Sequence, residues 1–280
     1  MASPLITSPR STRAVAARRL ATRAFRAKQA LFLVEGPQAV REAAAHGAGI
    51  TELYYTAAAA ERHAEIIQAA RDGGATLLPT TDEVVSSLSD TVHPQGMVAV
   101  CRFLDEPVAA VLAHAPRLVV LLAHVRDPGN VGSVIRAADA AGADAVLVSD
   151  ESVDVYNPKA VRATVGSLFH LPIVVGVPVD AAVAACRAAG LRVLAADGSG
   201  ALDLDDEADS GVLRSPTCWM FGNEAWGLPE ELRSLADATV RVPIHGKAES
   251  LNLSTAAAVC LYASARAQRQ YGEEGEHGRR

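Results

Sequence analysis

The sequence predicts an α/β protein in which a compact α/β domain precedes a larger domain built on a mostly parallel sheet. First, apolar runs of strand length alternate with helical segments along most of the chain. Second, the continuous apolar run at 117–125 is typical of a central parallel strand that is buried on both faces. Third, 280 residues with 50% hydrophobic content suffice for two cores without metal or disulfide support.

The first half of the chain opens with an Ala- and Arg-rich segment, and the lack of Pro and Gly over 10–30 predicts a helix there. Pro37 suits the first turn of a helix, and Gly73-Gly74 ends another. Strands are expected at 31–36, 50–56, 75–80 and 96–103, and helices at 37–46, 57–74 and 81–89. These elements predict an N-terminal arm at 1–30, a domain at 31–104 and a linker at 105–116.

The second half repeats the alternation of strand, short loop and helix with stronger signals. Strands are expected at 117–125, 144–150, 171–177, 191–197, 217–223 and 239–244, and helices at 130–143, 157–169, 179–190, 228–236 and 252–270. This pattern predicts a domain over 117–270, a disordered tail at 271–280, and ligand sites at the carboxyl ends of the strands.

The charge of the chain is unevenly distributed, because the first 34 residues carry seven basic side chains and no acidic one. These side chains are Arg10, Arg13, Arg18, Arg19, Arg23, Arg26 and Lys28. A basic arm on an acidic body indicates contact with a polyanion, and the alternatives are a solvated helix face or a frayed terminus.

Several common classes of protein lack support in the sequence. No apolar run reaches the length of a membrane span, and no signal peptide is visible. The four cysteines have no ligand or disulfide spacing, which indicates reduced thiols in a cytoplasmic protein, and no histidine pair has metal-ligand spacing. The dinucleotide, phosphate-loop, HExxH and GxSxG motifs are missing.

Three polar loops follow predicted strands and are the candidate site. They are HVRDPGNVGSVIR at 124–136, WMFGNEAWGLPEEL at 219–232 and VPIHGKAESLNLSTAAAV at 242–259. In the first loop Asn130 suits a helix N-cap. In the second, two glycines within six residues allow backbone contact with a ligand. In the third, Ser250, Asn252 and Ser254 place hydrogen-bonding groups at alternate positions.

These three motifs, in this order and each after a strand, resemble the SpoU (TrmH-like) branch of the SPOUT RNA methyltransferases over about 117–268. The first domain, with LFLVEG at 31–36, is similar to the ribosomal-protein-like substrate-binding domain of many relatives. The resemblance implies a trefoil-knotted SPOUT methyltransferase domain, a homodimer, S-adenosylmethionine as cofactor, no metal, and methylation of a ribose 2′-hydroxyl in structured RNA.

The resemblance also implies roles for individual residues. Arg136 is the expected catalytic arginine, and the other expected catalytic residues are Asn130, Glu224, Ser250 and Asn252. The expected cofactor-binding residues are Gly222, Asn223, Ile244, Ser250, Leu251 and Leu253. Arg162 is the RNA-binding residue that the resemblance implies. The charge of the N-terminal segment, and not the resemblance, adds the other expected RNA-binding residues: Arg10, Arg13, Arg18, Arg19 and Lys28.

Some alternatives stay open at this point. Arg136 either takes the hydroxyl proton, which requires a lowered pKa, or orients the RNA while water or phosphate takes the proton. Ribosomal RNA, 23S rRNA in particular, is favoured over tRNA as substrate, and both a housekeeping and an antibiotic-resistance role are compatible with the motifs. A catalytically silent RNA-binding module and a nucleotide hydrolase are the competing classes.

Overall fold

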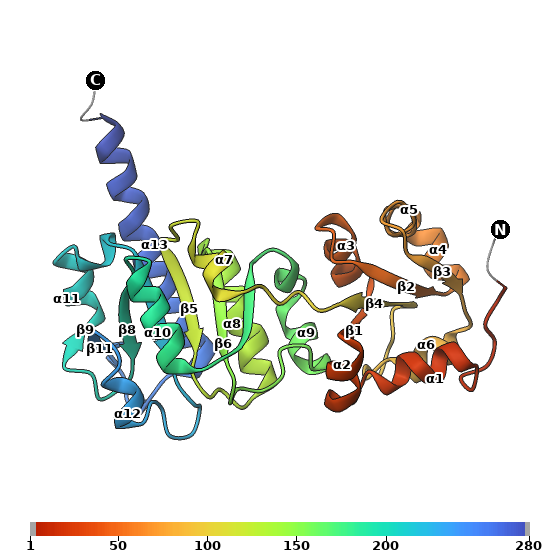
Figure 1. The fold of residues 1–280 in the computed structure, drawn as a ribbon, viewed down its shortest axis with the longest axis horizontal. Helices are drawn as coiled ribbons and strands as arrows, with labels where there is room; N and C mark the ends of the chain where they lie inside the picture. The colour runs from red at the N-terminus through yellow and green to blue at the C-terminus, as the bar shows by residue number, and fades with distance from the viewer. Residues whose placement is uncertain (1–3, 278–280) are drawn as a thin grey trace. The chain divides into compact units, whose positions relative to one another are not determined.

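The computed structural model describes residues 4–277, which form two compact units (Figure 1). Unit 1 comprises Met1–Leu104 with Tyr156–His170, and unit 2 comprises Asp105–Val155 with Leu171–Arg280. The segment Tyr156–His170 departs from the continuous ranges that we expected. It belongs to unit 1 because the ring of Tyr156 stacks on that of Phe103, with centroids 4.0 Å apart and planes at 15°.

Unit 1 is built on a four-stranded mixed sheet in the order β1-β4-β2-β3. Its elements are α1 (Thr12–Arg19), α2 (Arg23–Gln29), β1 (Leu31–Glu35), α3 (Pro37–Ala45), β2 (Ile50–Tyr55), α4 (Ala57–Arg62), α5 (Ala64–Asp72), β3 (Thr76–Pro79), α6 (Asp82–Leu88), β4 (Met97–Arg102), α9 (Pro158–Thr164) and η1 (Ser167–Phe169). β4 is antiparallel to β1 and β2, whereas β2 and β3 are parallel. The predicted helix over 57–74 is interrupted at His63, between α4 and α5.

The basic N-terminal segment is an integral part of unit 1. In place of the single helix expected over 10–30, α1 and α2 meet at a turn in which the buried Arg26 donates to the carbonyls of Leu20 and Ala21, at 2.8 and 2.7 Å. Ala14, Ala17 and Leu20 pack into the hydrophobic core of the sheet. The six other basic side chains of the segment are exposed.

Unit 2 contains a seven-stranded, all-parallel sheet in the order β7-β6-β5-β10-β8-β11-β9, which confirms the predicted fold class. Its elements are α7 (Val108–Leu112), β5 (Leu118–Leu122), α8 (Pro128–Ala141), β6 (Ala145–Ser149), β7 (Ile173–Val177), α10 (Val179–Ala188), β8 (Arg192–Ala196), β9 (Leu202–Asp203), α11 (Leu204–Asp209), η2 (Val212–Arg214), β10 (Thr217–Phe221), α12 (Glu230–Arg233), β11 (Ala238–Arg241) and α13 (Leu253–His277). The knot that the resemblance implies stays a prediction.

The central strands β5, β6 and β10 are buried along their whole length, as two-sided coverage requires. Apolar residues of α7 and α10 pack on one face of the sheet. α13 contacts α8 and the sheet, and the indole of the buried Trp219 donates to the Ser264 hydroxyl of α13 at 2.9 Å. This packing fixes the strand ends that carry the three motifs.

The sequence predicts a disordered tail at 271–280, but α13 continues to His277. The last three residues of that range lie outside the described part of the chain. No helix within residues 4–277 is long and apolar enough to cross a membrane.

Candidate functional site

The first motif lies at the carboxyl end of β5, where the chain turns into α8. Asp127 is the N-cap of α8 and accepts a hydrogen bond from the Asn130 backbone N–H at 2.9 Å, and Pro128 occupies the first helical turn. The prediction of Asn130 as the N-cap was therefore wrong by one turn. Because the backbone of Asn130 is already capped, its side chain is available for contacts with the other two motifs.

The second motif reaches the first through the carboxylate of Glu224. Its Oε1 accepts from the backbone N–H of Asp127 at 3.0 Å and from Nδ2 of Asn130 at 3.2 Å. Its Oε2 accepts from the backbone N–H of Arg126 at 3.2 Å. A carboxylate near the start of a helix is also stabilised by the helix dipole. Glu224 thus fixes the loop after β10 against the start of α8.

The third motif joins the same network through Asn252. Its Nδ2 donates to Oδ1 of Asn130 at 3.1 Å, and its Oδ1 accepts from the backbone N–H and the hydroxyl of Ser254 at 2.9 and 2.6 Å. A continuous chain of hydrogen bonds therefore runs from Glu224 through Asn130 and Asn252 to the start of α13. We call these three residues and Ser254 the relay.

The turn after β10 is held by the buried Asn223. Its Nδ2 donates to the His124 carbonyl at 3.0 Å, and its backbone exchanges two 2.9 Å hydrogen bonds with Gly227. A Cβ at Gly222 would lie 2.4 Å from the Gly227 carbonyl oxygen. Residue 222 must therefore lack a side chain, as expected where backbone approaches backbone.

A cavity of about 750 Å³ opens beside the relay at the ends of β8, β10 and β11. Its lining includes all six predicted cofactor-binding residues: Gly222, Asn223, Ile244, Ser250, Leu251 and Leu253. The volume is within the range of about 300–1,000 Å³ that is typical of small-molecule sites. Its lining combines aliphatic side chains with the carboxylates of Asp197, Glu224 and Glu249.

Asp197 is a cavity residue that the sequence analysis missed. Burial acts to raise the pKa of its carboxyl group, but hydrogen bonds from the side chain and backbone of Ser199 and from the Leu228 N–H, together with the Arg233 guanidinium, lower that pKa below its ordinary value. Its position at the carboxyl end of β8 was the available signal, because ligands of parallel sheets bind at such ends.

The remaining predicted residues are distributed over both units. Arg136 is exposed on α8, and among the described residues it has no hydrogen-bond or ion-pair partner. Arg162 lies in unit 1, where its Nη1 is 3.1 Å from Oε1 of Glu35 and 3.9 Å from a carboxylate oxygen of Asp90. Arg10, Arg13, Arg18, Arg19 and Lys28 are exposed at the N-terminal end of unit 1.

Both units match known protein families. Residues 117–262 match the SpoU rRNA Methylase family, and residues 14–99 match the MRM3-like substrate binding domain. The 23S rRNA (guanosine(2553)-2′-O)-methyltransferase RlmP of Bacillus subtilis is 32% identical over 247 residues, which cover 88% of this chain and 92% of the relative. The 23S rRNA (uridine(2479)-2′-O)-methyltransferase of Streptomyces viridochromogenes is 34% identical over 256 residues, which cover 88% of this chain and 86% of the relative.

Solved structures are similar along nearly the whole chain. An AdoMet-bound rRNA methyltransferase from Sinorhizobium meliloti has a TM-score of 0.81 at 31% identity, with 94% of this chain and 97% of that chain covered. The SpoU methyltransferase AviRb from Streptomyces viridochromogenes, in complex with AdoMet, also has a TM-score of 0.81, at 32% identity, with 93% and 100% covered.

Proposed function

Because the chain belongs to the SpoU rRNA methylase family and is an RNA 2′-O-ribose methyltransferase, we propose that its cavity holds S-adenosylmethionine and that its substrate is 23S rRNA. The observation that carries the proposal is the relay, which joins the three motifs by hydrogen bonds directly beside the cavity. A catalytically silent module of the same fold would not need hydrogen bonds that join the three motif loops beside a cavity. The relay therefore disfavours such a module.

The chemistry of the cavity fits S-adenosylmethionine. Ile244, Leu251 and Leu253 offer aliphatic surface for the adenine, and the backbone at Gly222 is open to close approach. The carboxylates of Asp197 and Glu249 offer negative charge to a cationic ligand. When bound, this cofactor supplies an already activated methyl group on a sulfonium, so the protein has mainly to align the attacking oxygen.

Arg136 is the residue that we assign to the RNA. Its guanidinium is exposed and offers a planar set of donors, which suits a phosphate and the neighbouring ribose hydroxyl. Glu224, Asn130 and Asn252 are positioning residues, because they fix the start of α8, and Arg136 lies about two turns further along this helix. Ser250 lines the cavity, and we assign it to the cofactor site. Transfer by this arrangement uses no metal.

Unit 1 supplies RNA affinity in this proposal. The exposed basic residues of α1 and α2 attract phosphate. Arg162 contributes to RNA binding only if phosphate competes with Glu35 and Asp90 for its guanidinium.

The active form in this proposal is a homodimer that resides in the cytoplasm with its RNA. We assign the dimer contact to the outer side of α13, because Val259 and Tyr262 are 41% and 54% exposed there, while Ala257, Cys260 and Leu261 face inward.

The proposal is tested by methyl transfer to 23S rRNA and to tRNA in the presence of EDTA. Transfer should be specific for 23S rRNA, and Arg136→Ala and Arg136→Lys should both abolish it, since lysine lacks the planar fork. Calorimetric affinity for S-adenosylhomocysteine should stay within a few-fold in both variants, and Arg71→Lys on the exposed side of α5 is the matched control. Near-normal turnover by Arg136→Lys, or transfer to tRNA alone, would contradict the proposal.

A further inference from the structure

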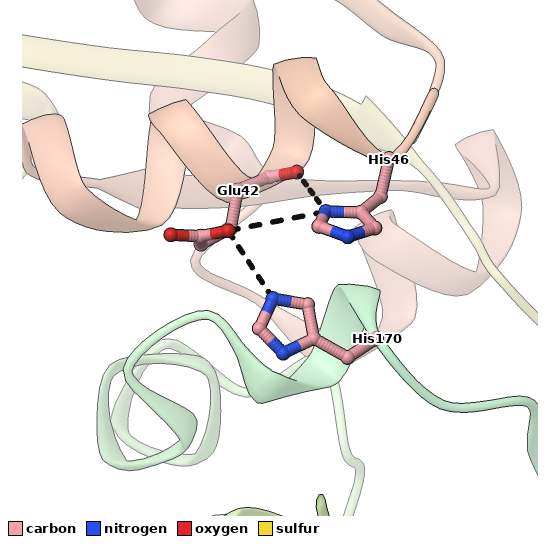
Figure 2. A group of neighbouring side chains, drawn as sticks. All are labelled: Glu42, His46 and His170. Atoms are coloured by element: carbon pink, nitrogen blue, oxygen red, sulfur yellow. Dashed lines mark hydrogen bonds and ion pairs between the residues drawn. The ribbon is translucent and has the colours of Figure 1, made fainter.

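Three potential metal ligands meet in unit 1, in a part of the molecule that the proposed reaction does not use (Figure 2). They are Glu42 on α3, His46 at its C-terminal cap, and His170 directly after η1. One ligand atom from each lies within 4.8 Å of the others, and Oε2 of Glu42 is 3.2 Å from Nε2 of His170 and 3.9 Å from Nδ1 of His46. The sequence analysis found no histidine pair with ligand spacing because His46 and His170 come from distant parts of the chain.

Neighbouring groups hold Glu42 and His46 in a fixed orientation. Oε1 of Glu42 accepts from Nε2 of Gln38 at 2.9 Å, so that Oε2 is the oxygen that faces both imidazoles in Figure 2. Nδ1 of His46 is 3.0 Å from the Glu42 carbonyl oxygen. If Nδ1 carries the proton and donates to that carbonyl, Nε2 is the basic nitrogen. Metal-bound histidines in proteins typically donate their second ring nitrogen to a carbonyl or carboxylate in this way.

The backbone is shaped to bring His170 to this position. Gly166 has a φ of +102°, and a Cβ there would lie 2.5 Å from Cγ of Glu42. Only glycine therefore lets the turn that begins η1 close on α3 next to the carboxylate. The two imidazole centroids are 4.6 Å apart as a result.

We propose that Glu42, His46 and His170 bind a Zn²⁺ ion, with water as the fourth ligand. Two imidazoles and one carboxylate form a ligand set that zinc uses with an open fourth position. With bonds of about 2.0–2.2 Å, tetrahedral ligands are separated by roughly 3.3–3.6 Å. The Glu42–His170 separation is already close to this range, whereas the His46 ring, whose Nδ1 lies 3.9 Å from Oε2 of Glu42, has to turn so that it presents Nε2 to the ion.

The ion would act as a clamp between two distant segments of unit 1. It would tie η1 and the segment 156–170 to α3, and so stabilise the arrangement that places Arg162 beside Glu35. The side chains of Glu42, His46 and His170 are 21%, 44% and 29% exposed, so the ion should exchange with solvent and be removed by chelators. Its role is separate from methyl transfer, which we expect to proceed in EDTA.

The test uses the full chain without an affinity tag, stripped with EDTA and dialysed. Titration calorimetry with ZnCl₂ should give one equivalent of binding, which His46→Ala and His170→Ala each weaken at least tenfold. A hundredfold excess of Zn²⁺ over its Kd should raise the Tm of the wild-type chain by roughly 5 °C, and Mg²⁺ should not. X-ray absorption at the zinc edge should show a nitrogen and oxygen shell with imidazole scattering.

His114→Ala is the matched control, because Nδ1 of the exposed His114 contacts the Ala110 carbonyl at the same 3.0 Å and the same sequence separation, outside the cluster. It should bind Zn²⁺ like the wild-type chain. The proposal is overturned if the wild-type chain shows no saturable Zn²⁺ binding, or if both His46→Ala and His170→Ala bind it unchanged. Since the reaction is assayed in EDTA, neither result bears on the proposed methyl transfer.

Discussion

Replacing Glu224 with glutamine tests whether the relay positions the catalytic arginine. The carboxylate of Glu224 accepts three hydrogen bonds, from the backbone N–H groups of Arg126 and Asp127 and from the Asn130 side chain. In Glu224→Gln an NH₂ group replaces one of the two carboxylate oxygens. This NH₂ group is a donor and cannot accept the hydrogen bonds of the N–H groups that face it. At least one of the three hydrogen bonds is therefore lost, while the size of the side chain is unchanged.

The expected magnitude follows from those contacts. A hydrogen bond to a charged group contributes about 1.5–3 kcal/mol, and the exposure of Glu224 places the loss toward the lower part of that range. A loss of about 1.5–2 kcal/mol corresponds to roughly a ten- to thirtyfold effect. Because the relay fixes the start of α8, this loss should fall mainly on turnover, with a smaller loss in cofactor affinity from the altered cavity wall.

The assay is single-turnover methyl transfer to 23S rRNA, together with calorimetric binding of S-adenosylhomocysteine. Glu231→Gln, an exposed glutamate on α12, is the matched control and should behave like the wild-type chain. If Glu224→Gln transfers methyl groups at the wild-type rate, the carboxylate does not position the site and the reasoning from the relay is wrong.

Three further predictions concern charge, association and pH. The double variant Arg10→Gln/Arg18→Gln should make the slope of log RNA affinity against log salt shallower by about 1.5–2 units if both side chains meet phosphate; an unchanged slope would favour a solvated helix face. Val259→Glu/Tyr262→Glu should yield a monomer in sedimentation, and a persistent dimer would place the contact elsewhere. Burial acts to raise the pKa of Asp237, but hydrogen bonds from a guanidinium and a backbone N–H outweigh it and lower that pKa. The contribution of the Asp237 carboxylate to the free energy of unfolding should thus be complete above about pH 4 and be lost as the pH falls through the lowered pKa. In Asp237→Asn, the free energy of unfolding, measured with urea at a series of pH values, should therefore decrease less on acidification than in the wild-type chain.

Local patterns were sufficient for most of the elements and for the three motif loops. The apolar run that became β5 and the Gly-Pro stop before α3 are signals within a few residues, and the parallel order of strands then places the loops at one edge. The two-residue β9 and the short α11 escaped prediction because neither is long enough to show periodicity.

Contacts between distant residues could not be predicted in the same way. Asp127 followed by Pro128 is a local N-cap signal that the sequence analysis passed over, but nothing local indicates that the Asn130 amide contacts Glu224 and Asn252. The break between α1 and α2 depends on Arg26 folding back onto carbonyl groups, which helix propensity does not describe.

The placement of Tyr156–His170 in unit 1 has a consequence for how the chain is made. Unit 1 cannot be completed when residue 104 leaves the ribosome, because the missing piece of its core is synthesised only after β5, α8 and β6 of unit 2. At about 5–20 residues per second, some three to thirteen seconds separate residue 104 from residue 170. During that interval Phe32 and Phe103 lack the ring of Tyr156. Nascent chains stalled before residue 156 should therefore expose an aromatic patch that a chaperone specific for hydrophobic segments can bind, and chains stalled well beyond residue 170 should not.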